Sequence, residues 1–242
     1  MIKKIKDLRV KIFGDGADKD SMLELNQLPF IKGFTTNPTL MRKAGITDYA
    51  SFAKEILSEI KEKPVSFEVF SDDFGEMERQ ARIIASWADN VYVKIPITNT
   101  KKESSFELVK KLAAERIKLN VTAILTVPQV SHIKNAFPQN VPAIISVFAG
   151  RIADTGHNPL PIMKEAKAVL ATHPNLELLW ASPRQLLDIY NADEAGCEII
   201  TVTHDILKKL DKIGYDHHEY SLDTVKMFYE DGQKAGYTLY ES

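Results

Sequence analysis

The chain has 242 residues, of which 44% are hydrophobic and 26% charged, and its formal net charge is −2. This length fits one large domain or two small ones, and the apolar content is enough for a sizeable core. A near-neutral charge, without a basic stripe interleaved with aromatic residues, argues against nucleic acid as the main partner. The single Cys197, the lack of an apolar signal segment and the lack of a run of transmembrane length predict a cytoplasmic protein without a membrane partner.

Apolar, β-branched stretches alternate with amphipathic ones along most of the chain. Strands are predicted over residues 8–13, 30–36, 65–70, 91–96, 117–125, 143–148, 177–181 and 198–202. Helices are predicted over residues 19–26, 47–61, 72–89, 104–115, 128–137, 159–172, 183–190 and 203–210. This alternation predicts the α/β class and a single-domain (β/α)8 TIM barrel. A doubly wound open sheet is the alternative, because strand number alone does not establish closure.

The end of the chain differs in character from these repeating units. Residues 215–220 are polar and contain two histidines, and residues 221–234 form an amphipathic pattern that includes Leu222 and Phe228. We therefore expect the barrel over residues 1–214. Residues 215–242 form a tail whose helix packs on the barrel or on a neighbouring subunit.

The stretch 91–96, Val-Tyr-Val-Lys-Ile-Pro, places a lysine near the end of a short apolar strand. Pro96 cannot donate to a strand ladder and fits the point where the strand ends. Partial desolvation of Lys94 there would favour the neutral amine, the form that attacks a carbonyl in Schiff-base chemistry. The alternative is a charge on an edge strand or in solvent.

Other polar residues fall at the carboxyl ends of the predicted strands, where barrels carry their active groups. They are Asp15, Thr36, Asn37, Glu68, Asn120, Thr122, Ser146, Arg151, Ser182 and Arg184. Most have a structural alternative, such as a turn former, a strand former or a surface charge. Glu68 is the exception, because a carboxylate within an apolar strand needs a partner or a raised pKa. Because all of these residues are expected at the same end of the barrel, an active site is favoured over separate structural roles.

The six histidines show no metal-ligand spacing, and the chain has neither an HExxH motif nor paired CxxC motifs. No glycine-rich nucleotide-binding motif is present either. We therefore expect neither a metal nor another cofactor.

Several of these segments together resemble the transaldolase family of class I Schiff-base aldolases, in its short transaldolase and fructose-6-phosphate aldolase group. The matching segments are residues 33–39, 91–96, 119–122, 146–151 and 181–184, in the order that the family uses. The resemblance covers roughly the whole barrel. It implies phosphorylated sugar substrates, no cofactor, a role in carbohydrate metabolism such as the pentose phosphate pathway, and a homo-oligomer assembled through the tail helix.

The resemblance also implies residue roles. Lys94 corresponds to the Schiff-base nucleophile, Asp15 to the acid/base that assists carbon–carbon cleavage, and Glu68 with Thr122 to the pair that holds a catalytic water. The substrate-binding residues implied are Thr36, Asn37, Asn120, Ser146, Phe148, Arg151, Ser182 and Arg184, with the arginines at the phosphate.

Two positions bear on the reaction type. Fructose-6-phosphate aldolases of this group have glutamine in place of Glu68 and tyrosine in place of Phe148, so this chain matches the transaldolases at both. We therefore expect transfer of a dihydroxyacetone unit between sugar phosphates. The alternatives are an aldolase that releases dihydroxyacetone, an aldolase acting on a related modified sugar, and a barrel that binds sugar phosphates for regulation or assembly.

Overall fold

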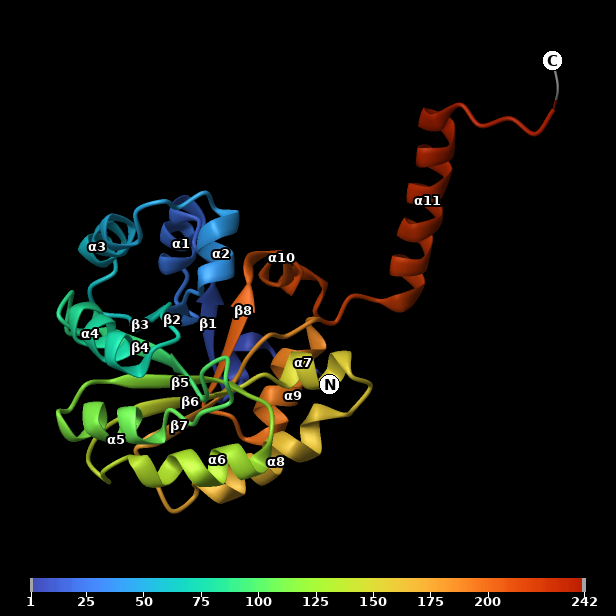
Figure 1. Cartoon of the computed structure of the whole chain (residues 1–242). Coiled ribbons are helices and arrows are strands. Elements are labelled where there is room, and N and C mark those ends of the chain that lie inside the picture. The colour runs from blue at the N-terminus through green and yellow to red at the C-terminus, as the bar shows by residue number, and fades with distance from the viewer. Residues whose placement is uncertain (1, 241–242) are drawn as a thin grey trace.

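The computed structural model describes residues 2–240. Its eight strands close into a barrel in the order β1 to β8, and every neighbouring pair is parallel (Figure 1). The strands are β1 (Lys11–Asp15), β2 (Ile31–Thr35), β3 (Val65–Glu68), β4 (Val91–Pro96), β5 (Leu119–Ile124), β6 (Ala143–Val147), β7 (Leu176–Trp180) and β8 (Ile199–Thr203). The predicted (β/α)8 barrel is thus confirmed, because the pairing of β1 with β8 excludes an open sheet.

Helices follow each strand, and all but the last of them surround this barrel. They are α1 (Lys19–Asn26), α2 (Pro38–Lys43), α3 (Tyr49–Glu59), α4 (Phe74–Ala85), α5 (Phe106–Ala114), α6 (Val127–Ile133), α7 (Ala149–Asp154), α8 (Pro159–Leu170), α9 (Leu187–Ala195), α10 (His204–Leu207) and α11 (His217–Ala235). Short 3₁₀ turns occur at Ile5–Asp7, Lys134–Ala136 and Leu210–Lys212.

The apolar residues form two clusters, as a closed barrel requires. The larger cluster lies between the outer faces of the strands and the helices. The smaller one is made of Phe13, Ile144, Leu179, Ala181 and Ile199, against which Tyr92 and Phe148 pack. Because side chains alternate along a strand, Phe13 and Tyr92 point to the same interior as Asp15 and Lys94, two residues further on. The small cluster is therefore the apolar floor beneath the polar end of the barrel.

Two short helices that the sequence analysis did not predict follow β2 and β6. The Asn37 side chain caps α2 by accepting from the Leu40 N–H at 3.0 Å. Pro38 occupies the first turn of α2, where a missing N–H costs nothing. The second, α7, is only six residues long, too short for a helical period to stand out.

The helix predicted over residues 183–190 begins later, at Leu187. The Asp188 carboxylate accepts from the backbone N–H of Arg184 at 2.7 Å and of Gln185 at 3.2 Å, which holds those residues in a turn ahead of α9.

The tail helix α11 begins at His217, four residues before the predicted start at residue 221, because the Asp216 carboxylate caps it. None of its residues is buried, and Figure 1 shows the helix standing away from the barrel. Within residues 2–240, no helix is both long and apolar enough to cross a membrane.

Asp193, on α9, ties the start of the chain to the barrel. Its carboxylate accepts from the N–H groups of Arg9 at 2.6 Å and Val10 at 3.2 Å, and from Lys3 Nζ at 2.8 Å. Burial opposes ionisation of this side chain. The hydrogen bonds from Lys3, Arg9 and Val10 outweigh that effect, so the pKa of Asp193 is lowered.

We expect Asp193→Asn to lower the free energy of unfolding at pH 7 by about 1–3 kcal/mol. The amide nitrogen of asparagine cannot accept from Lys3 Nζ, and its neutral oxygen accepts more weakly than a carboxylate from the Arg9 and Val10 N–H groups. A lowered carboxyl pKa stabilises the fold above the pKa of the unfolded chain, and this stability is lost as the pH falls through the folded pKa. Urea titrations at pH 7 and at about pH 4 should therefore show that the difference in free energy of unfolding between Asp193→Asn and wild type is smaller at the lower pH. Asp20→Asn, at an exposed position, is the control; a gap that does not depend on pH would contradict the assignment.

Candidate active site

A cavity of about 560 Å³ opens at the carboxyl ends of the strands. Eleven of the twelve predicted site residues line it, and they come from seven of the eight strands and the segments that follow those strands. They are Asp15, Asn37, Glu68, Lys94, Asn120, Thr122, Ser146, Phe148, Arg151, Ser182 and Arg184. Thr36 does not line the cavity: its hydroxyl is fully buried and donates to the Ser66 carbonyl at 2.9 Å.

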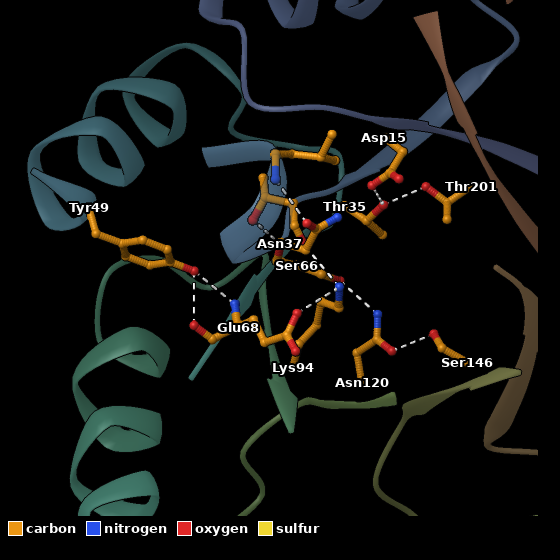
Figure 2. Close-up of polar contacts among 12 residues, drawn as sticks. Asp15, Thr35, Asn37, Tyr49, Ser66, Glu68, Lys94, Asn120, Ser146 and Thr201 are labelled. Carbon is orange, nitrogen blue, oxygen red and sulfur yellow. Dashed lines mark hydrogen bonds and ion pairs between the residues drawn. The ribbon is translucent and has the colours of Figure 1, made fainter. Parts of the chain in front are cut away.

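Lys94 lies at the centre of the site because of strand register. It pairs with Glu68 across β3–β4 and with Asn120 across β4–β5, so the three inward side chains lie side by side (Figure 2). The Lys94 side chain is only 8% exposed. Its Nζ lies 3.1 Å from Glu68 Oε2 and donates to the Thr36 carbonyl at 2.8 Å. A buried amine thus faces one carboxylate and one backbone acceptor.

Asp15 lies at the end of β1 and accepts a hydrogen bond from one threonine hydroxyl, which in turn bonds a second threonine. Thr35 Oγ1 donates to Asp15 Oδ1 at 2.7 Å, and it also contacts the hydroxyl of Thr201 on β8 (Figure 2). Since Thr35 gives its one proton to Asp15, Thr201 is the donor in the second bond. Burial raises the pKa of Asp15, and the Lys94 charge and the Thr35 hydrogen bond only partly oppose that rise.

The Asn120 amide is fixed on both sides. Its Nδ2 donates to Ser66 Oγ at 3.1 Å, and its Oδ1 accepts from Ser146 Oγ at 2.6 Å. These bonds set the orientation of the amide beside Lys94. Ser66 and Thr35 were not predicted as site residues, although each lies on the inward face of its strand.

Thr122 lies two residues beyond Asn120, just before an irregularity in β5. Ala123 has a left-handed backbone (φ 61°), and the pairing with β6 shifts between Val121 and Ile124. The Thr122 hydroxyl is buried at the cavity wall and has no hydrogen-bond partner among the described protein atoms. An unpaired buried hydroxyl is costly, so this group is suited to a water or substrate oxygen in the cavity.

Two arginines lie at the outer rim. The Arg151 guanidinium lies 5.1 Å from the centre of the Phe148 ring, within cation–π range. The Arg184 guanidinium forms a two-point ion pair with Asp154, with Nε 3.0 Å from Oδ1 and Nη2 against Oδ2. Three of its five N–H groups are not used in this pair. The rim is therefore cationic and suited to an anion.

Within residues 2–240, no group of three or more His, Cys, Asp or Glu side chains is arranged to hold a metal ion. The cavity therefore offers amine, carboxylate, hydroxyl, amide and guanidinium groups as its chemistry.

A closed parallel barrel with such groups gathered at the carboxyl ends of its strands defines the class of (β/α)8-barrel enzymes. Within that class, the family model described as Transaldolase/Fructose-6-phosphate aldolase matches residues 12–239. The chain belongs to this family.

Curated relatives agree with this assignment. A probable transaldolase of Thermoanaerobacter sp. is 33% identical over 228 residues, covering 94% of this chain and 99% of that protein. Probable transaldolase 2 of Listeria monocytogenes is 37% identical over 202 residues, covering 83% of this chain and 88% of that protein. A probable transaldolase of Dehalococcoides mccartyi is 33% identical over 204 residues.

Among solved structures, a crystal structure of 2,3-dimethylmalate lyase, described as a PEP mutase/isocitrate lyase superfamily member, aligns with a TM-score of 0.55. The alignment covers 98% of this chain and 88% of that one, at 11% sequence identity, and so supports the fold alone.

The raised pKa of Asp15 has a consequence for stability. A carboxyl whose pKa is higher in the folded state binds a proton more tightly there, so stability falls as the pH rises from the unfolded pKa through the folded one. We expect Asp15→Asn to raise the melting temperature at pH 7, and this gain should shrink as the pH falls toward about 4. Differential scanning calorimetry between pH 7 and about pH 4 measures this change in melting temperature, with Asp211→Asn, at an exposed position, as the control. A variant less stable than wild type at pH 7 would contradict the assignment.

Proposed function

We propose that the protein is a transaldolase that transfers a dihydroxyacetone unit from a ketose phosphate to an aldose phosphate through a Schiff base on Lys94. The donors are fructose 6-phosphate and sedoheptulose 7-phosphate. The observation that carries this proposal is the buried Lys94 amine, 3.1 Å from the Glu68 carboxylate and at the centre of the cavity. A desolvated amine beside a proton acceptor is suited to attack on a ketone.

In the first step Glu68 takes a proton from the Lys94 ammonium, and the neutral amine attacks the C2 ketone to form a carbinolamine. Loss of water then gives the iminium. The carbinolamine hydroxyl leaves as water only after it receives a proton. Glu68 can supply the proton that it accepted from Lys94. The unpaired Thr122 hydroxyl supports a water held between Thr122 and Glu68 as the carrier of that proton.

Asp15 then removes the proton of the C4 hydroxyl. The C3–C4 bond breaks, its electron pair moves into the iminium, and an aldose phosphate leaves while a three-carbon enamine stays on Lys94. When a second aldose phosphate enters, Asp15 returns the proton to the new hydroxyl and the steps run in reverse. A carboxyl that must act as base and then as acid works best with a pKa nearer the working pH, and the raised pKa of Asp15 supports this role.

The rim supplies recognition of the phosphate. Arg151 and the three uncommitted N–H groups of Arg184 are donors that a phosphate oxygen can accept. Asp154 pairs with Arg184 and limits the directions in which its guanidinium can point. The hydroxyls and amides of Asn37, Asn120 and Ser146 are suited to the sugar hydroxyls.

Phe148 supports transfer over release of dihydroxyacetone. Its ring lines the cavity and offers no hydroxyl to protonate the enamine, which can then persist until an aldehyde arrives. An aldolase that releases dihydroxyacetone is the alternative that the product analysis below distinguishes.

The decisive experiment is intact mass after incubation with fructose 6-phosphate and borohydride. We expect a three-carbon adduct on wild type and on the exposed control Lys110→Met, and none on Lys94→Met. Adding erythrose 4-phosphate without borohydride should then yield sedoheptulose 7-phosphate and glyceraldehyde 3-phosphate. Free dihydroxyacetone without an acceptor would favour the aldolase, and no adduct with a panel of ketoses would overturn the enzymatic proposal.

We also propose that the protein is a homo-oligomer whose tail, residues 215–242, docks on a second copy. In support, the apolar residues Leu222, Val225, Phe228 and Tyr229 lie on one side of α11 and are 46–67% exposed. None of the residues of α11 is buried against the rest of the chain. An exposed apolar stripe on such a helix is typical of a protein–protein contact.

We expect wild type to sediment as an assembly of several subunits, and Val225→Asp with Phe228→Asp to sediment as a smaller species. A charge on this stripe would have to be desolvated on docking. Asp231→Ala, which lies away from the stripe on α11, should leave the assembly intact. A monomeric wild type at micromolar concentration would contradict the proposal.

A further inference from the structure

Tyr49 does not line the cavity, yet its hydroxyl contacts the strand that carries Glu68 (Figure 2). The phenol oxygen accepts from the Glu68 N–H at 2.8 Å and donates to the Glu68 carbonyl at 3.0 Å. Glu68 is the last residue of β3, and its carboxylate pairs with Lys94. One side chain outside the cavity thus satisfies both backbone groups of a residue inside it.

The two bonds take the place of a bond that the sheet would otherwise make. The Thr36 N–H donates to the Ser66 carbonyl at 3.0 Å. If the parallel ladder continued, the next bond would run from the Glu68 N–H back to the Thr36 carbonyl. That carbonyl instead accepts from Lys94 Nζ at 2.8 Å. The Tyr49 hydroxyl is therefore a substitute acceptor that leaves the Thr36 carbonyl available to the lysine.

The surroundings of Tyr49 fix the direction of its hydroxyl. Tyr49 is the first residue of α3, whose start is capped by Asp48. Its ring packs against Phe67, Phe70 and Trp87, with ring centres 6.2, 5.5 and 6.0 Å away. Burial raises the pKa of the Tyr49 phenol, so the hydroxyl keeps the proton that it donates to the Glu68 carbonyl.

We propose that Tyr49 is a positioning residue for the reaction: by completing the β3 edge in place of Thr36, its hydroxyl keeps Glu68 and the Lys94 amine facing each other. The inference rests on the Schiff-base function proposed above. Without the hydroxyl, the Glu68 N–H either stays unpaired or turns to the Thr36 carbonyl, which already accepts from the Lys94 amine. In the second case one carbonyl is shared between two donors, and either outcome displaces the pair.

Tyr49→Phe tests this inference, because it keeps the packed ring and removes only the oxygen. We expect kcat and the rate of borohydride-trapped adduct formation to fall about 10- to 100-fold, as for a reacting group misplaced by about 1 Å. The KM of the ketose phosphate should change by less than about twofold, since no substrate contact is removed. The apparent pKa in the pH profile of kcat that reports proton transfer should also differ between Tyr49→Phe and wild type.

Tyr190→Phe is the matched control. It also removes a phenol hydroxyl that donates to a backbone carbonyl, that of Lys3 at 2.9 Å, and Tyr190 does not line the cavity. This variant should keep the wild-type kcat. Full activity of Tyr49→Phe, or an equal loss in both variants, would overturn the proposal.

Amide hydrogen exchange of Glu68 gives a readout that needs no substrate. We expect the wild-type amide to be protected, and to exchange at least about tenfold faster in Tyr49→Phe. A Glu68 amide that exchanges in wild type like an exposed loop would overturn the inference even if the variant does not fold. If no ketose gives an adduct with wild type, the proposed function fails, and the exchange comparison still decides whether the hydroxyl holds this backbone.

Discussion

The Lys94–Glu68 pair is the interaction around which the site is built. Both side chains lie inside the barrel, with the lysine 8% and the glutamate 18% exposed. Burial of an ion pair costs more than the pair returns unless further hydrogen bonds satisfy it. The Thr36 carbonyl supplies one such bond to the amine, and the Tyr49 hydroxyl holds the backbone of the glutamate. The Thr36 bond therefore helps the interior tolerate the lysine charge, and the Tyr49 bonds hold the strand end that carries the glutamate.

The period of the β-strand places these charges above an apolar floor. Phe13 and Tyr92 lie two residues before Asp15 and Lys94 on the same strands, and both belong to the apolar interior cluster. Residues on the intervening positions, such as Gly14 and Val93, are buried on the outer face against the helices. The alternation of side chains along each strand therefore produces the outer core, the apolar floor inside the barrel and the polar end above that floor.

The sequence was sufficient for those features that depend on strand patterns. The strand at 91–96 was predicted at its observed bounds, and eleven predicted site residues line one cavity, because strand ends in a parallel barrel meet at one face. Whether the sheet closes, by contrast, depends on β1 pairing with β8, which no local pattern reveals.

The partners of the site residues were beyond the reach of sequence reasoning. Ser66 and Thr35 are ordinary strand residues until the fold places them against Asn120 and Asp15. Tyr49 fits an amphipathic helix pattern and acts on a residue 19 positions away. Asp154 lies on α7, which was not predicted, so its pairing with Arg184 had no signal. Contacts between different strand ends and loops depend on the third dimension.

The rim shows how the loops set the reach of the site. Ser182 has a left-handed backbone (φ 62°), a conformation that a non-glycine residue rarely adopts without surrounding support. Its carbonyl approaches α7 so closely that a Cβ on Gly150 would lie 1.5 Å from it, so only glycine fits there. This contact locks the loop that carries Arg184 against the helix that carries Arg151. Both segments follow strands of the same closed barrel that carries Lys94, so the barrel sets the spacing between the amine and the two guanidinium groups.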